Sequence, residues 1–351
     1  MRRYRLEVFG RDLNFKTFAE TSEPSIALDK LVQTESEVEC FGIIQCDRGD
    51  YGQIRVDGNV YYQGVISDLE YDGNKTTVTL QQLDSLLDNE VFADVSLLNS
   101  QTVETWMTNL LSSFFNGSDT YQNLTGFTVT SSSATQGSYT TSDDGSYNMY
   151  DLMNHFFKVY GVILSISFDA SAKTITFAFS AVDTSKVTKL NVRVTDVQTF
   201  AIENSITDDH CNKMTVRDMN SSDSLTYYWH PTQFGGSVDT DPSTNRETPV
   251  KTQCIAIVLE EGQSFADASY TFAYQAMYNS RYDDLITVSF KADSKLMPVG
   301  ALGDLYELMD GENTYLTMLT GIRVLNMRYA EMTFGYVRKR LTQIIKMDRR
   351  K

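Results

Sequence analysis

The sequence has few of the residues from which metal sites and most catalytic sites are built. Its 351 residues include only three histidines, namely His155, His210 and His230. Its four cysteines are Cys40, Cys46, Cys211 and Cys254, and no two of them have the short paired spacing of a metal site or a disulfide-rich fold. We therefore expect no cofactor, no metal site, and free, mostly buried thiols.

Long apolar segments are also missing. No run of apolar residues is long enough for a signal peptide or a membrane span, although Arg2, Arg3 and Arg5 give the N-terminus a basic character. We expect no stable membrane insertion and a protein that stays in the cytoplasm until it is assembled.

Positive charge is scarce as well. The chain has 30 Lys and Arg against 46 Asp and Glu, a formal net charge of −16. A surface that grips nucleic acid neutralises phosphates with basic side chains, so this balance argues against DNA binding as the function.

Aromatic residues are plentiful and proline is rare, with 20 Tyr, 19 Phe and 5 Pro. This balance favours sheets, and the length favours two or more domains. We expect an α+β, mainly β, fold with two similar β-barrel domains, an inserted α+β domain and a further small mixed domain. The predicted boundaries are 1–95 for the first barrel, 96–188 for the insertion, 189–282 for the mixed domain and 283–351 for the second barrel.

Periodicity places the individual elements. Alternation around Asp57-Gly58 predicts a hairpin, followed by a strand over 76–80 and a short helix near Leu83 and Leu87. Helical spacing predicts helices over 100–115, 150–160 and 265–281, and a basic helix over 336–350. Further strands are expected over 162–168, 174–179, 191–194, 213–217, 225–229 and 253–259. Polar composition predicts long loops over 116–148, with one exposed hairpin as an alternative there, and a loop over 235–249.

An internal repeat appears when Asp57-Gly58 is placed on Asp310-Gly311. At this offset of 253 residues, or 254 after one insertion, several apolar positions coincide. They are Tyr62 with Tyr315, Ile66 with Leu319, Leu69 with Ile322, Val78 with Met332, Leu80 with Phe334, Leu83 with Val337 and Leu87 with Leu341. Both units read hairpin, strand, strand, short helix. Such repeats suit a ring in which a few chains must present a larger number of similar surfaces.

Candidate catalytic residues are weak. His210-Cys211 has no further ligand at useful spacing, while His155 and His230 fit structural roles. The run Tyr227-Tyr228-Trp229 alternates in a strand, which favours packing over a sugar platform. The carboxylate pairs Glu260-Glu261, Asp283-Asp284 and Asp143-Asp144 are neighbours in sequence only. We expect a protein that is not an enzyme.

The basic C-terminal run is interpreted as an inter-subunit contact, because an acidic neighbouring subunit is a natural partner for it, and DNA binding is the minor alternative. Its predicted contact residues are Arg338, Lys339, Arg340, Lys346, Arg349 and Arg350.

Three groups of residues together resemble a known family. The first is Leu319-Thr320-Gly321 with Thr333-Phe334-Gly335, Arg338 and Leu341-Thr342. The second is Thr226-Tyr227-Tyr228 with Asn245-Arg246 and Thr248-Pro249, and the third is 25–29, taken as a first-barrel strand, with Phe41-Gly42. In order and spacing they are similar to the tail-tip hub, or tail-associated protein, of siphophages, which resembles the baseplate hub of contractile tails. The family resembled is prophage tail endopeptidase-like, and we expect no appended enzyme domain in this chain.

The resemblance implies a homotrimeric ring that continues the tail tube and closes it before infection. Its implied partners are a hexameric distal tail protein, the tape-measure protein and receptor-binding or fibre proteins, with DNA only in passage. Its implied location is the virion tail tip or baseplate, after assembly in the host bacterial cytoplasm. The alternative is a cell-wall carbohydrate-binding or peptidoglycan-degrading tail protein, with its site in the two polar loops. An unrelated secreted β-protein is a third reading, disfavoured by the missing signal peptide and disulfide pattern.

Overall fold

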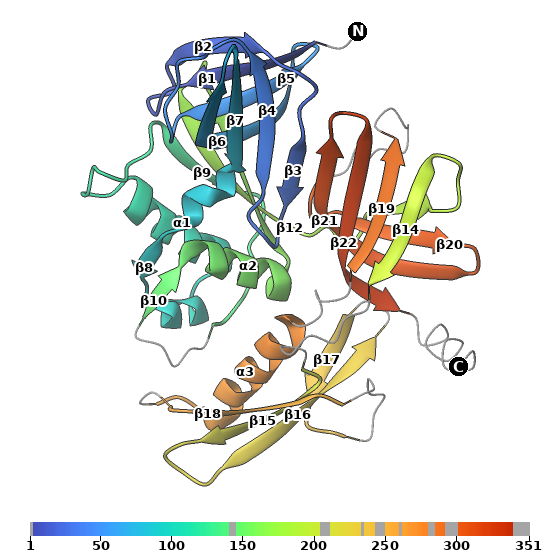
Figure 1. The fold of residues 1–351 in the computed structure, drawn as a ribbon. Coiled ribbons are helices and arrows are strands. Elements are labelled where there is room, and N and C mark those ends of the chain that lie inside the picture. Colours follow the sequence, from blue (N-terminus) through green and yellow to red (C-terminus); the bar gives the residue numbers. More distant parts are fainter. Residues whose placement is uncertain are drawn as a thin grey trace.

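The computed structural model describes residues 3–139, 145–203, 211–232, 235–242, 250–259, 262–279, 285–291 and 301–339. Strands dominate, and the three α-helices of the described part lie in two smaller units beside two curved sheets (Figure 1). The expected α+β, mainly β, fold is confirmed. Within the described residues, no helix has both the length and the apolar character needed to cross a membrane. The predicted domain boundaries remain predictions.

The first curved sheet is built from the N-terminal strands in the order β2-β1-β5-β6-β7-β4. Their bounds are β1 Tyr4–Phe9, β2 Phe15–Glu20, β4 Glu35–Phe41, β5 Tyr51–Val56, β6 Asn59–Asp72 and β7 Lys75–Gln82. Isolated bridges Thr21↔Cys40 and Ser25↔Glu37 bring the chain after β2 alongside β4, so the sheet curls toward closure. The predicted hairpin turns at Asp57-Gly58, where both residues have positive φ, and the predicted short helix is the 3₁₀ helix η1, Leu83–Leu87.

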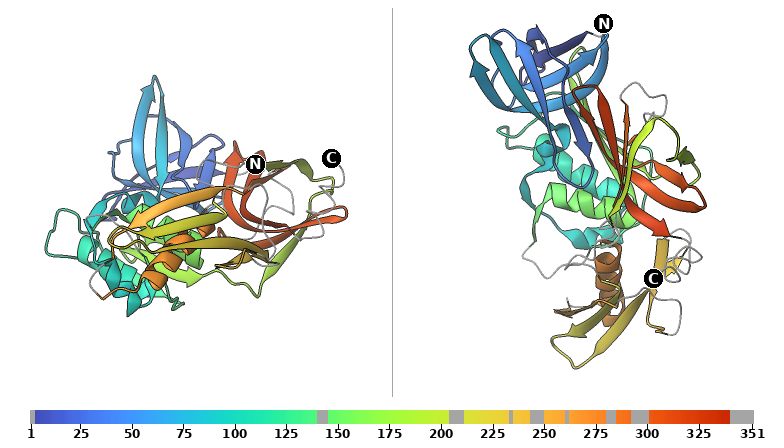
Figure 2. Two further views of the ribbon diagram at one scale, coloured as in Figure 1. Left: turned by 90° about the horizontal axis from the view of Figure 1, so that it is seen from below. Right: turned by 45° about the vertical axis from the view of Figure 1, so that its right-hand side comes forward.

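The second curved sheet has the order β13-β20-β21-β22-β19-β14. Its strands are β13 Val187–Asn191, β14 Val197–Glu203, β19 Leu285–Lys291, β20 Leu305–Asp310, β21 Asn313–Leu325 and β22 Tyr329–Lys339. The core between its faces includes the fully buried Phe290, Leu319 and Phe334. The two curved sheets stand side by side, as both views in Figure 2 show.

Strand β3, Ile26–Asp29, corrects the expectation that 25–29 forms part of the first barrel's own sheet. It pairs antiparallel with β21 of the second sheet, in the register Ile26↔Val324 to Asp29↔Gly321. The apolar residue Ile26 is buried among residues from both sheets, and this burial stabilises the pairing of β3 with β21.

An α+β unit lies next to the first curved sheet (Figure 1). It contains η2 Val95–Asn99, α1 Val103–Phe115, α2 Met149–Tyr160, β8 Glu90–Phe92, β9 Phe127–Ser131, β10 Ser146–Asn148, β11 Val162–Asp169 and β12 Thr174–Ala181. The side chains of Thr102 and Asn148 cap the two helices at their N-termini, and Gly161 ends α2 in the left-handed conformation. The segment 116–148, expected to form loops, includes the strands β9 and β10. These strands do not form a hairpin with each other, because β9 pairs with β12 and β10 pairs with β8.

A second small unit packs α3, Phe265–Asn279, on a four-stranded sheet of order β17-β16-β15-β18. The strands are β15 Lys213–Asp218, β16 Ser224–Thr232, β17 Gly235–Asp239 and β18 Thr252–Ile257. Tyr227 and Trp229 share the face under α3 and are 5% and 2% exposed. Their predicted packing role is confirmed: the Tyr227 hydroxyl lies 2.8 Å from Ser269 Oγ, and the Trp229 ring contacts Tyr278 edge-on.

Three local predictions were wrong. The helix over 336–350 is a strand as far as Lys339, because β22 pairs there with the first residues of β21; 340–351 lie outside the described residues. The strand at 191–194 ends at Asn191, where pairing with β20 stops. The loop at 235–249 begins with β17, which pairs with β16. The helices predicted over 100–115 and 150–160 are confirmed as α1 and α2, and the one predicted over 265–281 is confirmed as α3 as far as Asn279; 280–281 lie outside the described residues.

Candidate functional site

The predicted repeat is present in the strand register of the two curved sheets. We call these the first β unit, with β1, β2 and β4–β7, and the second β unit, with β13, β14 and β19–β22. Ile66 lies opposite Leu80, and Leu69 lies opposite Val78, in the β6–β7 pair. The equivalent positions are paired identically in the second unit, as Leu319↔Phe334 and Ile322↔Met332 in β21–β22. A β-bulge follows Ile66 in one unit and Leu319 in the other. Register and bulge agree, so the two units have the same local architecture.

A further pair of equivalent residues was not recognised from the sequence. Gly49 and Asp50 make reciprocal main-chain hydrogen bonds with Ile66, both 2.8 Å long. Gly303 and Asp304 make the same pair of bonds with Leu319, at 2.8 and 2.9 Å. Both glycines have positive φ, +87° and +100°. The shared Gly-Asp dipeptide just before β5 and β20 was the available signal.

The equivalence of β5, β6 and β7 with β20, β21 and β22 ends where β7 ends. The first unit continues from β7 into η1, which buries Leu83 and Leu87. The second unit continues as β22, so Val337 lies in a strand, and its predicted match to Leu83 in a short helix was wrong. Leu341 lies outside the described residues.

The two units are joined by direct contacts as well as by β3. Val324, Met327 and Ala330, near the tip of the β21–β22 hairpin, belong to the hydrophobic core of the first unit. Polar contacts surround this tip: Ser25 Oγ lies 3.1 Å from Asn326 Oδ1, and Arg328 forms an ion pair with Glu23 at 3.1 Å. The second hairpin therefore closes part of the first core, and the units form one continuous body.

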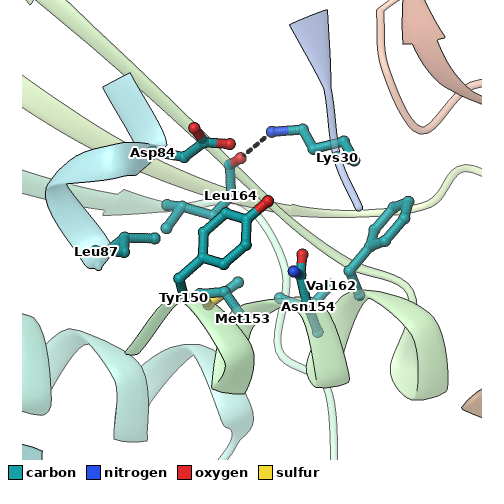
Figure 3. Close-up of a pocket in the computed structure, with 9 residues that line it drawn as sticks. Lys30, Asp84, Leu87, Tyr150, Met153, Asn154, Val162 and Leu164 are labelled. Atoms are coloured by element: carbon teal, nitrogen blue, oxygen red, sulfur yellow. Dashed lines mark hydrogen bonds between the residues drawn. The ribbon is translucent and has the colours of Figure 1, made fainter. Parts of the chain in front are cut away.

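A small cavity of about 30 Å³ lies where the end of β3, η1, α2 and β11 meet (Figure 3). The Lys30 ammonium donates to the main-chain carbonyl of Leu164 at 2.6 Å. Asp84 Oδ1 and the Tyr150 hydroxyl are buried and have no hydrogen-bond partner among the described residues. Burial raises the pKa of Asp84 to about 6, against the attraction of Lys30, and burial lowers the pKa of Lys30. The cavity is large enough for one water molecule.

The predicted contact residues at the C-terminus are separated by the structure. Arg338 and Lys339 are the last residues of β22, and their backbones pair with Leu316 and Tyr315. The other four lie outside the described residues: Arg340, Lys346, Arg349 and Arg350. Their role as an inter-subunit contact remains a prediction.

The histidine and cysteine candidates occupy structural positions. His155 packs edge-on against the ring of Tyr139, with a centroid distance of 4.7 Å, and burial lowers its pKa to about 4. His230 is 6% exposed and lies 2.8 Å from Asp239 Oδ1. Cys211 is buried in the core under α3, and His210 lies outside the described residues. All four cysteines are free thiols: Cys40 and Cys211 are buried, Cys46 is half-buried and Cys254 is exposed.

Metal-binding clusters are not found in the part of the chain that the structure describes. No group of three or more His, Cys, Asp and Glu residues in that part has the geometry to hold a metal ion. The three carboxylate pairs proposed from the sequence lie outside it: Glu260-Glu261, Asp283-Asp284 and Asp143-Asp144.

Sequence reasoning missed Glu104 in α1, which borders an open groove of about 530 Å³ lined by Thr, Ser and Asn side chains. Glu104 is 1% exposed. Its carboxylate accepts 2.7 Å hydrogen bonds from Ser133 Oγ and from both the main-chain nitrogen and Oγ1 of Thr135. The glutamate therefore holds the loop after β9 on α1, and no sequence signal distinguished it from an exposed helical glutamate.

Comparison with known proteins gives a consistent result at the level of fold. No protein-family model matches the sequence, and no curated protein matches it. Among solved structures, the chain is similar to a tail protein from Neisseria meningitidis MC58, with a TM-score of 0.58, 13% identity, and coverage of 95% of this chain and 96% of that one.

Two further structures extend this likeness. The 43 kDa tail protein of prophage MuSo2 from Shewanella oneidensis gives a TM-score of 0.57 and 12% identity over 95% of this chain and 97% of that one. A chain of the phage P2 baseplate in its activated conformation gives a TM-score of 0.51 and 10% identity over 96% of this chain and 99% of that one. The whole chain, and not one of its units, therefore has the fold of phage tail and baseplate proteins, as its resemblance to tail hubs implied.

Proposed function

We propose that the protein is the structural hub of a bacteriophage tail tip or baseplate. In this role three copies form a ring that continues the tail tube and closes it before infection. The ring anchors the distal tail protein, the tape-measure protein and the adsorption apparatus of fibres or receptor-binding proteins. The protein acts in the virion after assembly in the host cytoplasm, and it performs no catalysis.

The observation that carries this proposal is the duplicated β unit. Ile66↔Leu80 and Leu319↔Phe334 are equivalent pairs on two units that pack directly against each other within one chain. Three copies would present six units of one architecture, which matches a tube with six-fold symmetry. The fold similarity to tail proteins along nearly the whole chain supports the same assignment.

The test is the mass of the full-length protein in solution, measured by light scattering over a range of concentrations. The chain has a mass of 39.7 kDa, so a trimer has about three times that mass. The measurement is repeated after addition of the distal tail protein from the same phage. A trimer alone, or three copies on one ring of the partner, is the expected result. A monomer that ignores this ring would contradict the proposal.

The alternative function, a cell-wall-binding or peptidoglycan-degrading tail protein, has one structural feature in its favour. The groove beside Glu104 is open and lined by hydroxyl groups, of which those of Ser131, Ser132 and Ser133 come from the predicted polar segment and the others from α1 and its N-cap. However, the three hydrogen bonds that Glu104 accepts occupy it as a structural anchor. Turnover of purified peptidoglycan that is lost in Glu104→Gln, while the variant stays folded, would favour this alternative.

A further inference from the structure

Equivalent positions in the two β units differ in exposure at one place. The shared register that sets Leu69 with Ile322 also sets Tyr71 with Val324, two residues further along each strand. Val324 is 1% exposed, whereas Tyr71 is 52% exposed. The same position is therefore covered in the second unit and uncovered in the first.

Val324 is covered by β3. This strand lies in sequence among the strands of the first unit but pairs with the edge of β21 from Gly321 to Val324. The equivalent edge of the first unit is Asp68–Tyr71 in β6. On this edge β6 pairs with β5 only as far as Val65, and its other edge carries β7. Within the described residues, no strand pairs with Asp68–Tyr71 on the β5 side. An open strand edge of this kind is a ready template for another strand.

The second unit has an equivalent of β3. In the first unit, the chain leading into β3 bridges β4 at Thr21↔Cys40 and Ser25↔Glu37. In the second unit, β14 meets β19, the equivalent of β4, at Val197↔Phe290 and Ala201↔Thr287. In both units the segment that precedes the bridged strand in sequence has one residue more between its two bridge positions than that strand has. Ile26, the first residue of β3, therefore corresponds to Ile202 near the end of β14.

We propose that the end of β14 in one copy pairs with the open edge of β6 in a second copy, with Ile202 opposite Tyr71. This inference rests on the proposed ring and names the surfaces that form it. It repeats between chains the contact that Ile26 and Val324 make within the chain. Because the two surfaces differ, the contact is head-to-tail, and it alternates with the internal contact around a closed ring.

The same register places Glu203 opposite Glu70, where the contact within the chain has Ala27 opposite Arg323. Two carboxylates facing each other across strands weaken the pairing. Glu70→Lys should therefore lower the dissociation constant between copies by roughly three- to tenfold. Glu70 is exposed, so this change should not affect folding.

The experiment is oxidative cross-linking of full-length chains in which the exposed Cys254 is replaced by Ser. Tyr71→Cys and Ile202→Cys are made in separate chains, because directly opposed residues in strands can approach closely enough for a disulfide. A linked dimer is expected when the two variants are mixed and not from either one alone. Tyr61→Cys mixed with Ile202→Cys is the control, since Tyr61 is 40% exposed at the opposite end of β6.

The outcomes separate this inference from the hub proposal. Linkage of the mixed Tyr71→Cys and Ile202→Cys chains, with tighter association of Glu70→Lys, supports the surface. A preparation that is trimeric by light scattering but forms no linked dimer overturns the surface and leaves the hub. A chain that stays monomeric at every concentration, with Glu70→Lys and the distal tail protein included, overturns both.

Discussion

The ammonium of Lys30 donates a hydrogen bond to the main-chain carbonyl of Leu164 across 2.6 Å. This bond joins the segment after β3, which belongs to the β units, to β11 of the inserted α+β unit. The carboxylate of Asp84 faces the same cavity from η1 (Figure 3). A cation and an anion are thus held at the junction of three units without a direct ion pair between them, which is a costly arrangement.

Asp84 makes the stability of this junction depend on pH. Burial raises its pKa to about 6 in the folded protein, from 3.8, so the folded state holds its proton more tightly than the unfolded state. The stabilisation is complete below about pH 4 and is lost as the pH rises through 6. Asp84→Asn should remove up to about 3 kcal/mol of pH dependence in the free energy of unfolding between pH 4 and 7.

Urea unfolding of the wild type and Asp84→Asn at several pH values measures this difference. Asp72→Asn is the matched control, because Asp72 is an exposed aspartate in β6. A difference between wild type and Asp84→Asn that is constant from pH 4 to 7 would show that Asp84 does not titrate in this way.

His155 makes a pH-dependent contribution of the opposite sign. Burial lowers its pKa to about 4 from 6.5, so the folded state favours the neutral ring, and within the part of the chain that the structure describes Nε2 has no hydrogen-bond partner. The stability is present above about pH 6.5 and is lost as the pH falls toward 4. His155→Phe should remove up to about 3 kcal/mol of this loss. Thermal unfolding from pH 7 to 4 measures it, and an equal acid sensitivity in the variant contradicts the prediction.

Much of the fold could be predicted because its signals are local. The Asp57-Gly58 turn, the alternation on either side and the helical stripe over 100–115 each lie within one segment. The repeat was visible because apolar positions such as Ile66 and Leu319 recur at a constant offset. The partner of β3 could not be predicted, since nothing in Ile26–Asp29 distinguishes pairing with β4 from pairing with a strand almost 300 residues away.

Buried polar residues were equally hidden in the sequence. Lys30, Asp84 and Glu104 are residue types that normally face solvent, and only the tertiary structure encloses them. The C-terminal segment was misjudged because Tyr336–Lys339 carries a helix-compatible sequence, yet β21 offers a paired edge there. Long-range pairing outweighed local propensity at that point.

Glu104 should stabilise the inserted unit most strongly at neutral pH. Burial alone would raise its pKa, but the hydrogen bonds from Thr135 and Ser133 outweigh this and lower it. A lowered pKa gives stability that is present above the unfolded value of about 4.5 and is lost as the pH falls below it. Glu104→Gln should lower the free energy of unfolding by about 1–3 kcal/mol at pH 7, and the deficit should shrink in acid.

Denaturant unfolding at pH 7 and pH 3.5 tests this. Glu90→Gln is the comparison, because Glu90 is an exposed glutamate of the same unit. If Glu104→Gln were as stable as Glu90→Gln at pH 7, the three short hydrogen bonds would contribute nothing net.

Gly321 should tolerate no larger side chain, because two strands from different β units approach it. A Cβ at this position would lie 2.6 Å from Asp29 Oδ2 and 3.3 Å from Thr333 Cβ. Gly321 lies within β21 opposite Asp29, the last residue of β3. Gly321→Val should therefore separate β3 from β21 and lower the free energy of unfolding by about 1–3 kcal/mol, the usual cost of overpacking.

The measurement that isolates this effect is hydrogen exchange of the β3 amides in the full-length variant. Loss of protection in Ile26–Asp29 with retained protection in β7 would show that the junction opens while the first unit stays folded. Asp29→Ala combined with Gly321→Ala supplies the control, because removing the carboxylate relieves the closest contact. Restored protection in this double variant, relative to Gly321→Ala alone, is expected if steric contact with Asp29 is the cause; equal loss in both would assign the effect to Thr333 or to the backbone instead.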